Sequence, residues 1–105
     1  MTTVTLKEQT QELLQETFPD EKDLDATVRQ LIEAEYLRRL RQYRRTDRSL
    51  SRKYGLSFDE FVNQRTTREM NFSWEVEQDA IAWETAVGGI LTMERKLKAL
   101  RAVDE

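Results

Sequence analysis

Turn-forming residues are scarce in this chain, and their scarcity sets most of what the chain can fold into. Only three Gly and one Pro occur among 105 residues. The proline, Pro19, separates an N-terminal segment from everything after it, and residues 20–54 contain neither Gly nor Pro. Because most reversals of chain direction use such residues, the sequence predicts few secondary-structure elements, and long ones.

The segment without Gly or Pro has the apolar periodicity of a helix, with steps of three and four residues. Between residues 36 and 54 the apolar positions follow a seven-residue repeat, as in a coiled-coil seam, with Asp47 as the one polar member. We therefore expect a long helix over about residues 22–54. Its apolar positions are Leu24, Val28, Leu31, Ile32, Tyr36, Leu40, Tyr43, Leu50 and Tyr54.

The next residues, Tyr-Gly-Leu-Ser-Phe-Asp-Glu-Phe, have the composition of a corner between two helices. Gly55 suits the left-handed position that commonly ends a helix. Ser57 and Glu60 have the spacing of a capping box, and Leu56 and Phe61 have the spacing of the hydrophobic staple that accompanies it. The sequence therefore predicts a short capped helix that begins at Ser57 and packs back on the long one.

A second long helix is expected over about residues 73–102, with acidic residues in its first turns and basic residues in its last. Gly88 and Gly89 interrupt its middle, and each glycine costs about 1 kcal/mol relative to Ala in a helix. They indicate either a hinge or close helix crossing, or a break between two shorter helices. The apolar stripe is Val76, Ala80, Trp83, Val87, Ile90 and Leu97.

These elements predict a mainly α protein, built as a long antiparallel helical hairpin with the short capped helix at its corner. Residues 1–105 make a single small domain, from which residues 1–19 can stand apart as an arm. The apolar content of 38% is low for an isolated small globule. For that reason, and because of the apolar seam, we expect a homodimer.

Two structures fit the N-terminal segment. Thr5 and Glu8 have the spacing of a capping box, which predicts a helix over 6–18. Residues 2–7 instead alternate between apolar and polar side chains, as in a short strand followed by a helix at 9–18. Both alternatives remain open.

The order strand, helix, helix resembles the ribbon-helix-helix DNA-binding domain, and residues 24–36 resemble its second helix. The resemblance implies that Thr3, Thr5 and Lys7 read bases in the major groove. Four carboxylates lie in the turn after Pro19, where they would repel phosphate. Nucleic acid is therefore expected as a secondary ligand at most.

Charge is segregated along the chain. Residues 1–37 carry 3 basic and 9 acidic side chains, residues 38–53 carry 8 and 1, and residues 54–94 carry 2 and 8. In the basic block five arginines share one helical stripe, which could dock on an acidic protein or a phosphate backbone. Alternatively the stripe is a solvated face, partly neutralised by Glu75, Asp79 and Glu84 across the hairpin. The stripe consists of Arg38, Arg41, Arg45, Arg48 and Arg52.

Several function classes are not expected. The chain has no Cys and no His, so the common nucleophile, base and zinc-ligand arrangements are missing. No Gly-rich phosphate loop and no apolar run of membrane-spanning length occurs. We therefore expect a non-enzymatic, cytoplasmic protein without cofactor or metal.

Residues 53–61 and 73–84 together resemble small helical proteins of prokaryotic toxin–antitoxin modules, and the resemblance extends over about 36–100. It implies an antitoxin-like subunit that binds and blocks a small toxin. Trp74 and Trp83, with the arginine stripe, are the candidate partner contacts, since Trp and Arg are common interface anchors. The two tryptophans are nine residues apart and point in opposite directions, so we expect Trp83, on the apolar stripe, in the hairpin core and Trp74 as the contact. A ribbon-helix-helix regulator and a structural coiled-coil adaptor are the alternatives.

Overall fold

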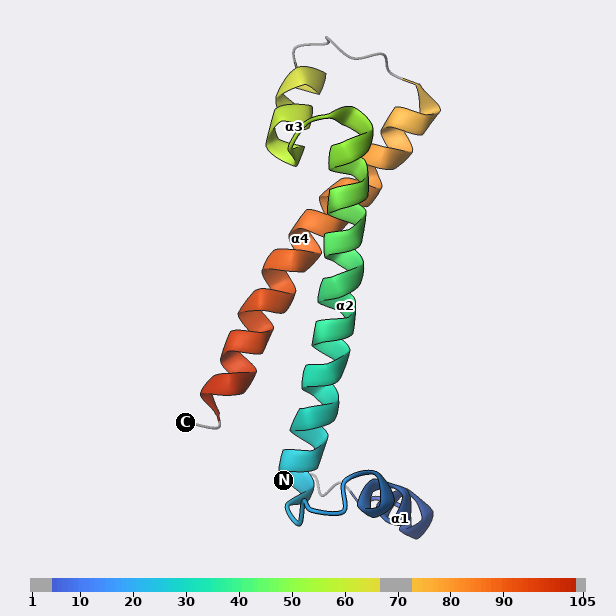
Figure 1. The fold of residues 1–105 in the computed structure, drawn as a ribbon, viewed down its shortest axis with the longest axis vertical. Coiled ribbons are helices and arrows are strands. Elements are labelled where there is room, and N and C mark those ends of the chain that lie inside the picture. Colours follow the sequence, from blue (N-terminus) through green and yellow to red (C-terminus); the bar gives the residue numbers. More distant parts are fainter. Residues whose placement is uncertain (1–4, 67–72, 104–105) are drawn as a thin grey trace. The chain divides into compact units, whose positions relative to one another are not determined.

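The computed structural model describes residues 5–66 and 73–103 (Figure 1). Four helices make up these ranges, which contain no strand, so the mainly α prediction is confirmed. The chain divides into two compact units, Met1–Ala34 and Glu35–Glu105, and the division falls inside the second helix. The helices are α1 (Glu8–Thr17), α2 (Leu24–Tyr54), α3 (Phe58–Thr66) and α4 (Trp74–Ala102).

The first unit contains α1 and the first turns of α2. The predicted capping box of α1 is wrong: α1 begins after Lys7, whose side chain makes no cap bond, and Thr5 lies outside the helix. Residues 5–7 are not in a strand, and residues 2–4, Thr3 among them, lie outside the described range. No residue of α1 is buried.

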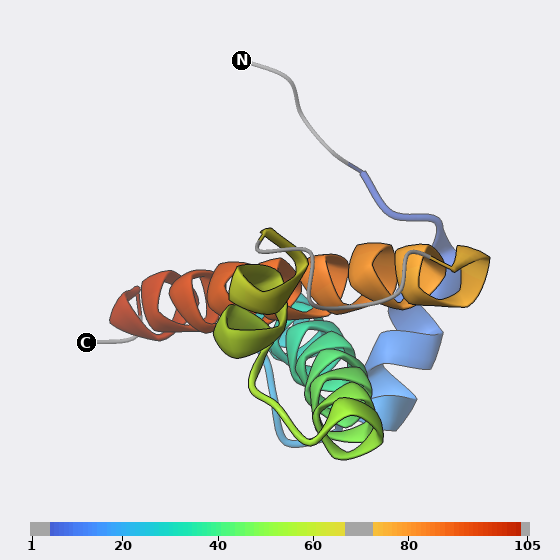
Figure 2. The ribbon, with the colours of Figure 1, turned by 90° about the horizontal axis from the view of Figure 1, so that it is seen from above.

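The second unit is the predicted helical hairpin. The C-terminal part of α2 and α4 run in roughly opposite directions and pack against each other, crossing at an angle (Figures 1 and 2). Their predicted apolar stripes form the inner faces, where aliphatic and aromatic side chains are withdrawn from water. One core cluster contains Leu50, Phe61, Ala80 and Trp83, and the other contains Leu40, Met93 and Leu97. The seam from which we inferred a homodimer is thus occupied by α4 of the same chain.

The corner between α2 and α3 has the predicted capping chemistry. Gly55 adopts a left-handed φ of 65°. The backbone N–H of Leu56 donates to the Ser51 carbonyl at 3.2 Å, as in a Schellman motif. The Ser57 N–H donates to the Glu60 carboxylate at 3.1 Å, and the Glu60 N–H donates to the Ser57 hydroxyl at 3.2 Å. Hydrogen bonding of the Glu60 carboxylate to the Ser57 backbone, and then to the Ser57 side chain, lowers the pKa of Glu60.

The short helix α3 closes one end of the hairpin. Phe61 is fully buried, and its ring centroid lies 4.9 Å from that of Tyr54 and 5.0 Å from that of Trp83. Leu56 and Phe58 pack against the same cluster from its edge. The hydrophobic staple predicted from Leu56 and Phe61 therefore holds α3 against both long helices.

The polar position in the seam has a specific partner. The indole N–H of Trp83 donates to the Asp47 carboxylate at 2.7 Å. An indole N–H buried without an acceptor costs about 1–3 kcal/mol. Asp47 therefore satisfies a donor that an apolar seam residue would leave unpaired.

The two glycines of α4 have different surroundings, and α4 continues through both of them. A β-carbon built on Gly89 would lie 2.5 Å from the ring of Tyr43, which is too close for any real contact. A β-carbon on Gly88 would meet nothing within 4 Å. The predicted close crossing is therefore confirmed at Gly89, between α4 and α2, and the alternative of two shorter helices is wrong.

Candidate functional site

The outer face of α4 carries large apolar side chains in water. Ser73 caps the helix by accepting a hydrogen bond from the Val76 N–H at 3.2 Å. Trp74 follows at once and is 74% exposed. Ile81, seven residues later, and Leu91 are also exposed. A step of seven keeps two side chains on one helix face, so Trp74 and Ile81 define an apolar outer face of α4, opposite its buried stripe. Leu91, ten residues after Ile81, points to the side of the helix.

Trp83 does not belong to that face. Its side chain is fully buried, and its ring lies 5.6 Å from Phe58 and 6.0 Å from Tyr54 between centroids. It is nine residues from Trp74 and therefore points to the opposite side of α4. The prediction that Trp83 lies in the hairpin core and that Trp74 is accessible is confirmed, so Trp83 is not a candidate partner contact.

The first arginine of the predicted stripe is already occupied. Arg38 donates to the Glu35 carboxylate through Nε at 2.9 Å and through a terminal nitrogen at 2.5 Å. Arg39 donates to the same carboxylate at 2.9 Å. Hydrogen bonds from Arg38 and then Arg39 lower the pKa of Glu35 to about 2. The Glu35 bond in turn raises the pKa of Arg38.

The other four arginines form the arginine stripe proper: Arg41, Arg45, Arg48 and Arg52. All four are exposed, and none pairs with a carboxylate in the described ranges. Three of them and Ser49 border an open hollow of about 570 Å³. They recur at steps of four, three and four, so their guanidinium groups line one side of α2 over about 16 Å.

The expected neutralisation of this stripe by α4 is wrong. Glu75 and Asp79 instead bind Lys53, whose Nζ lies 2.6 and 2.7 Å from their carboxylate oxygens. Glu84 is exposed and pairs with no cation among the residues that the structure describes. Glu94 pairs with Arg44 at 3.2 Å. The α4 carboxylates in these ion pairs therefore bind Lys53 and Arg44 of α2, and not the arginine stripe.

Lys53, Tyr54 and Asp79 form a small polar network at the edge of the core. The Tyr54 hydroxyl donates to Asp79 at 2.5 Å. Burial and this hydrogen bond raise the pKa of Tyr54 to about 12. Burial would raise the pKa of Asp79, but the bonds from Lys53 and Tyr54 outweigh it and lower that pKa. Asp79 and then Glu75 raise the pKa of Lys53 through their hydrogen bonds.

The structure does not bring Trp74 and the arginine stripe together. The arginines lie on α2 opposite its seam, and Trp74 lies on α4 opposite its buried stripe. Because the two inner faces meet in the core, the two outer faces point away from each other. The hairpin therefore offers two separate surfaces, one polar and cationic and the other apolar.

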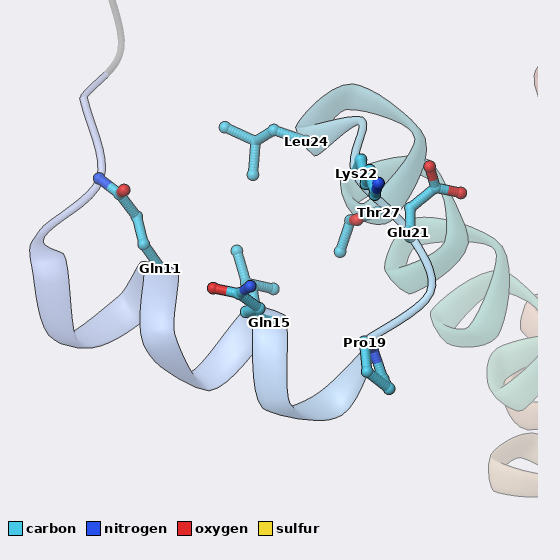
Figure 3. Close-up of a pocket in the computed structure, with 8 residues that line it drawn as sticks. Gln11, Gln15, Pro19, Glu21, Lys22, Leu24 and Thr27 are labelled. Carbon is cyan, nitrogen blue, oxygen red and sulfur yellow. The ribbon is translucent and has the colours of Figure 1, made fainter.

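The first unit has a mixed surface of its own. Figure 3 shows a hollow of about 380 Å³ between α1 and the start of α2, with Gln15 and Leu24 on its two sides. Leu24, Val28 and Leu31 are exposed on α2. Their spacing of four and three residues puts them on one face, which is turned well away from the seam formed between residues 36 and 54. Thr5 and Lys7 are also exposed.

None of the four helices in the described ranges has both the length and the apolar character needed to cross a lipid bilayer. Within residues 5–66 and 73–103, no three acidic side chains gather as metal ligands would. No protein-family model, no curated protein and no solved structure matches this chain.

Proposed function

We propose that this protein is a non-enzymatic, protein-binding subunit of the cytoplasm, antitoxin-like, which neutralises a small toxin by direct contact. The observation that supports the proposal is the apolar outer face of α4, formed by Trp74 and Ile81. Large apolar side chains that gather on one exposed face are typical of a protein-binding surface. The hairpin core does not need them, because it is complete on the other side of α4.

Trp74 is the expected anchor of this contact. Its side chain is 74% exposed and rigid, and burying an aromatic side chain of this size in a partner pocket contributes strongly to binding. Its place at the first turn of α4, after the Ser73 cap, fixes the backbone from which it projects. Truncating an interface anchor of this kind typically costs at least about 2 kcal/mol, roughly 30-fold in affinity.

The experiment measures binding of the full chain to the product of the neighbouring gene by calorimetry. Trp74→Ala and Ile81→Asp should each weaken binding at least roughly 30-fold. Leu13→Asp is the matched control, because Leu13 is 62% exposed and Ile81 is 64% exposed, but Leu13 lies on α1. The control should bind as tightly as the unchanged protein.

A growth assay tests the neutralising activity. Coexpression of the unchanged chain should restore growth to cells that make the toxin, and Ile81→Asp should fail to do so. If the neighbouring product neither binds nor inhibits growth, the proposal is wrong. If the Leu13→Asp control loses binding as much as Ile81→Asp does, the outer face of α4 is not the contact.

A further inference from the structure

We propose that the arginine stripe of α2, Arg41, Arg45, Arg48 and Arg52, binds the phosphate backbone of a nucleic acid. This binding is independent of the protein contact proposed for α4. It uses the opposite face of the hairpin and a different chemistry. The ligand class is a polyanion with regularly spaced phosphodiesters, recognised through its backbone and not through its bases.

The first argument is the lack of counter-charge on the stripe. Other arginines of α2 are engaged: Arg38 and Arg39 with Glu35, and Arg44 with Glu94. The four stripe arginines have no such carboxylate among the described residues. Like charges three or four residues apart destabilise a helix. Repulsion among the stripe arginines therefore destabilises the folded chain, and a bound polyanion would relieve this repulsion.

The second argument is the placement of nearby negative charge. Asp79 is paired with the cation of Lys53. Asp47 keeps its charge but lies on the seam, on the other side of α2 from the stripe, where it accepts from the Trp83 indole. A chain with a net charge of −3 can therefore still present a local strip of positive potential on this one face.

The third argument is geometric. The stripe spans about 16 Å along α2. One nucleic-acid strand carries a phosphate about every 3.4 Å of duplex axis, so this length faces about five phosphates. Guanidinium groups bind phosphate oxygens in a bidentate manner. Ser49, which borders the same hollow as three of the arginines, adds a hydroxyl of the kind that commonly contacts phosphate.

The composition of the stripe favours phosphate over an acidic protein. Protein interfaces depend on apolar or aromatic anchors, and exposed ion pairs alone contribute little. The hollow at the stripe is bordered by Arg45, Arg48, Arg52 and Ser49, with no apolar side chain among them. Phosphate binding needs no such anchor, because the release of condensed counterions drives it.

The test measures binding by fluorescence anisotropy. The probes are a labelled DNA duplex, an RNA duplex and a single strand of each, all of mixed sequence. If all four arginines contact phosphates, log affinity should fall against log salt with a slope of about −3.6 for duplex DNA and about −2.8 for single strands. Arg48→Gln with Arg52→Gln should halve either slope and weaken binding at low salt. Comparing the four probes shows which form of nucleic acid is the preferred source of phosphate.

The matched control is Arg95→Gln with Lys98→Gln, which removes two charges from the last turns of α4. This variant should keep the affinity and the salt slope of the unchanged protein, and circular dichroism should show full helix content in both variants. Polyglutamate of similar charge serves as the acidic-protein probe and should bind more weakly than the nucleic acids.

Three results would overturn the inference. The first is no binding to any nucleic-acid probe, and the second is an equal loss of nucleic-acid affinity in the stripe variant and in the α4 control variant. The third is polyglutamate binding at least as tight as that of the best nucleic acid. Trp74→Ala separates this inference from the proposed function. The variant should lose the protein partner and keep the nucleic acid. Loss of nucleic-acid binding in Trp74→Ala would place the ligand elsewhere than the stripe.

Discussion

At the scale of single residues, three side chains that look out of place in the sequence have direct partners. Asp47 interrupts an apolar seam because the Trp83 indole needs an acceptor. Gly89 weakens a helix because Tyr43 occupies the space of a β-carbon. Lys53 meets Glu75 and Asp79, where the sequence suggested the neighbouring arginines. Each of these features depends on the register between α2 and α4, which helical periodicity alone does not determine.

The two adjacent glycines predict opposite responses to the same substitution. Gly88→Ala should raise the free energy of unfolding by up to about 1 kcal/mol, because Ala is the better helix former and its methyl group meets no atom. Gly89→Ala should lower it, because overpacking against the Tyr43 ring typically costs about 1–3 kcal/mol. Urea unfolding of the two variants measures the difference. Stabilisation by both would mean that α4 and α2 do not cross closely at Gly89.

The network at Tyr54 predicts an alkaline effect. Its pKa is raised to about 12, so the neutral phenol is favoured in the folded state. The stabilisation is fully present below the ordinary tyrosine pKa of about 10 and is lost as the pH rises through about 12. Asp79→Asn removes the adjacent negative charge and should lower the Tyr54 pKa. Phenolate absorbance in a Tyr36→Phe, Tyr43→Phe background reports this pKa directly, and an unchanged value in Asp79→Asn would contradict the assignment.

At the scale of the elements, the sequence predicted best where the signals are local. Gly55, Ser57 and Glu60 all indicate one corner, and the structure has that corner. The bounds of α2 and α4 were likewise predictable, because their apolar stripes persist over many turns. The start of α1 was not predictable from Thr5 and Glu8. A capping box is only a spacing in the sequence, and here no apolar packing supports it.

The Ser57 cap at the corner between α2 and α3 should contribute to the stability of the protein. Ser57→Ala removes the acceptor for the Glu60 N–H and should cost about 1 kcal/mol in the free energy of unfolding. Ser57→Asp is the matched control, since Asp also caps helices well and should retain most of the stability. An unchanged unfolding midpoint in Ser57→Ala would show that the cap does not stabilise the corner.

At the scale of the whole molecule, the inner surfaces were predictable and the outer ones only in part. The sequence indicated which faces of the two long helices are apolar, and these faces form the core. It did not indicate that Trp74 and the arginine stripe occupy opposite sides of the hairpin. Helical spacing already separated Trp83, on the apolar stripe, from Trp74. The five arginines look alike as interface candidates until the fold pairs Arg38 with Glu35.

For the whole molecule we predict self-association as a homodimer. The hairpin seam is occupied, so a homodimer would have to use another apolar surface. Leu24, Val28 and Leu31 share another face of α2 and are exposed. We expect Leu31→Asp to weaken the dimer in sedimentation at micromolar concentration, and Leu91→Asp on α4 to leave it intact. A monomeric unchanged chain, or equal effects of the two variants, would exclude this surface.

The unequal burial of the two tryptophans also gives the protein a pair of intrinsic optical probes. Trp74 is 74% exposed and Trp83 is fully enclosed. A soluble quencher should therefore extinguish the red-shifted emission of Trp74 first and leave the bluer emission of Trp83. A ligand that covers the outer face of α4 would shield the first signal, whereas opening of the hairpin would shift the second. The unlabelled chain can thus report separately on what it binds and on whether it stays folded.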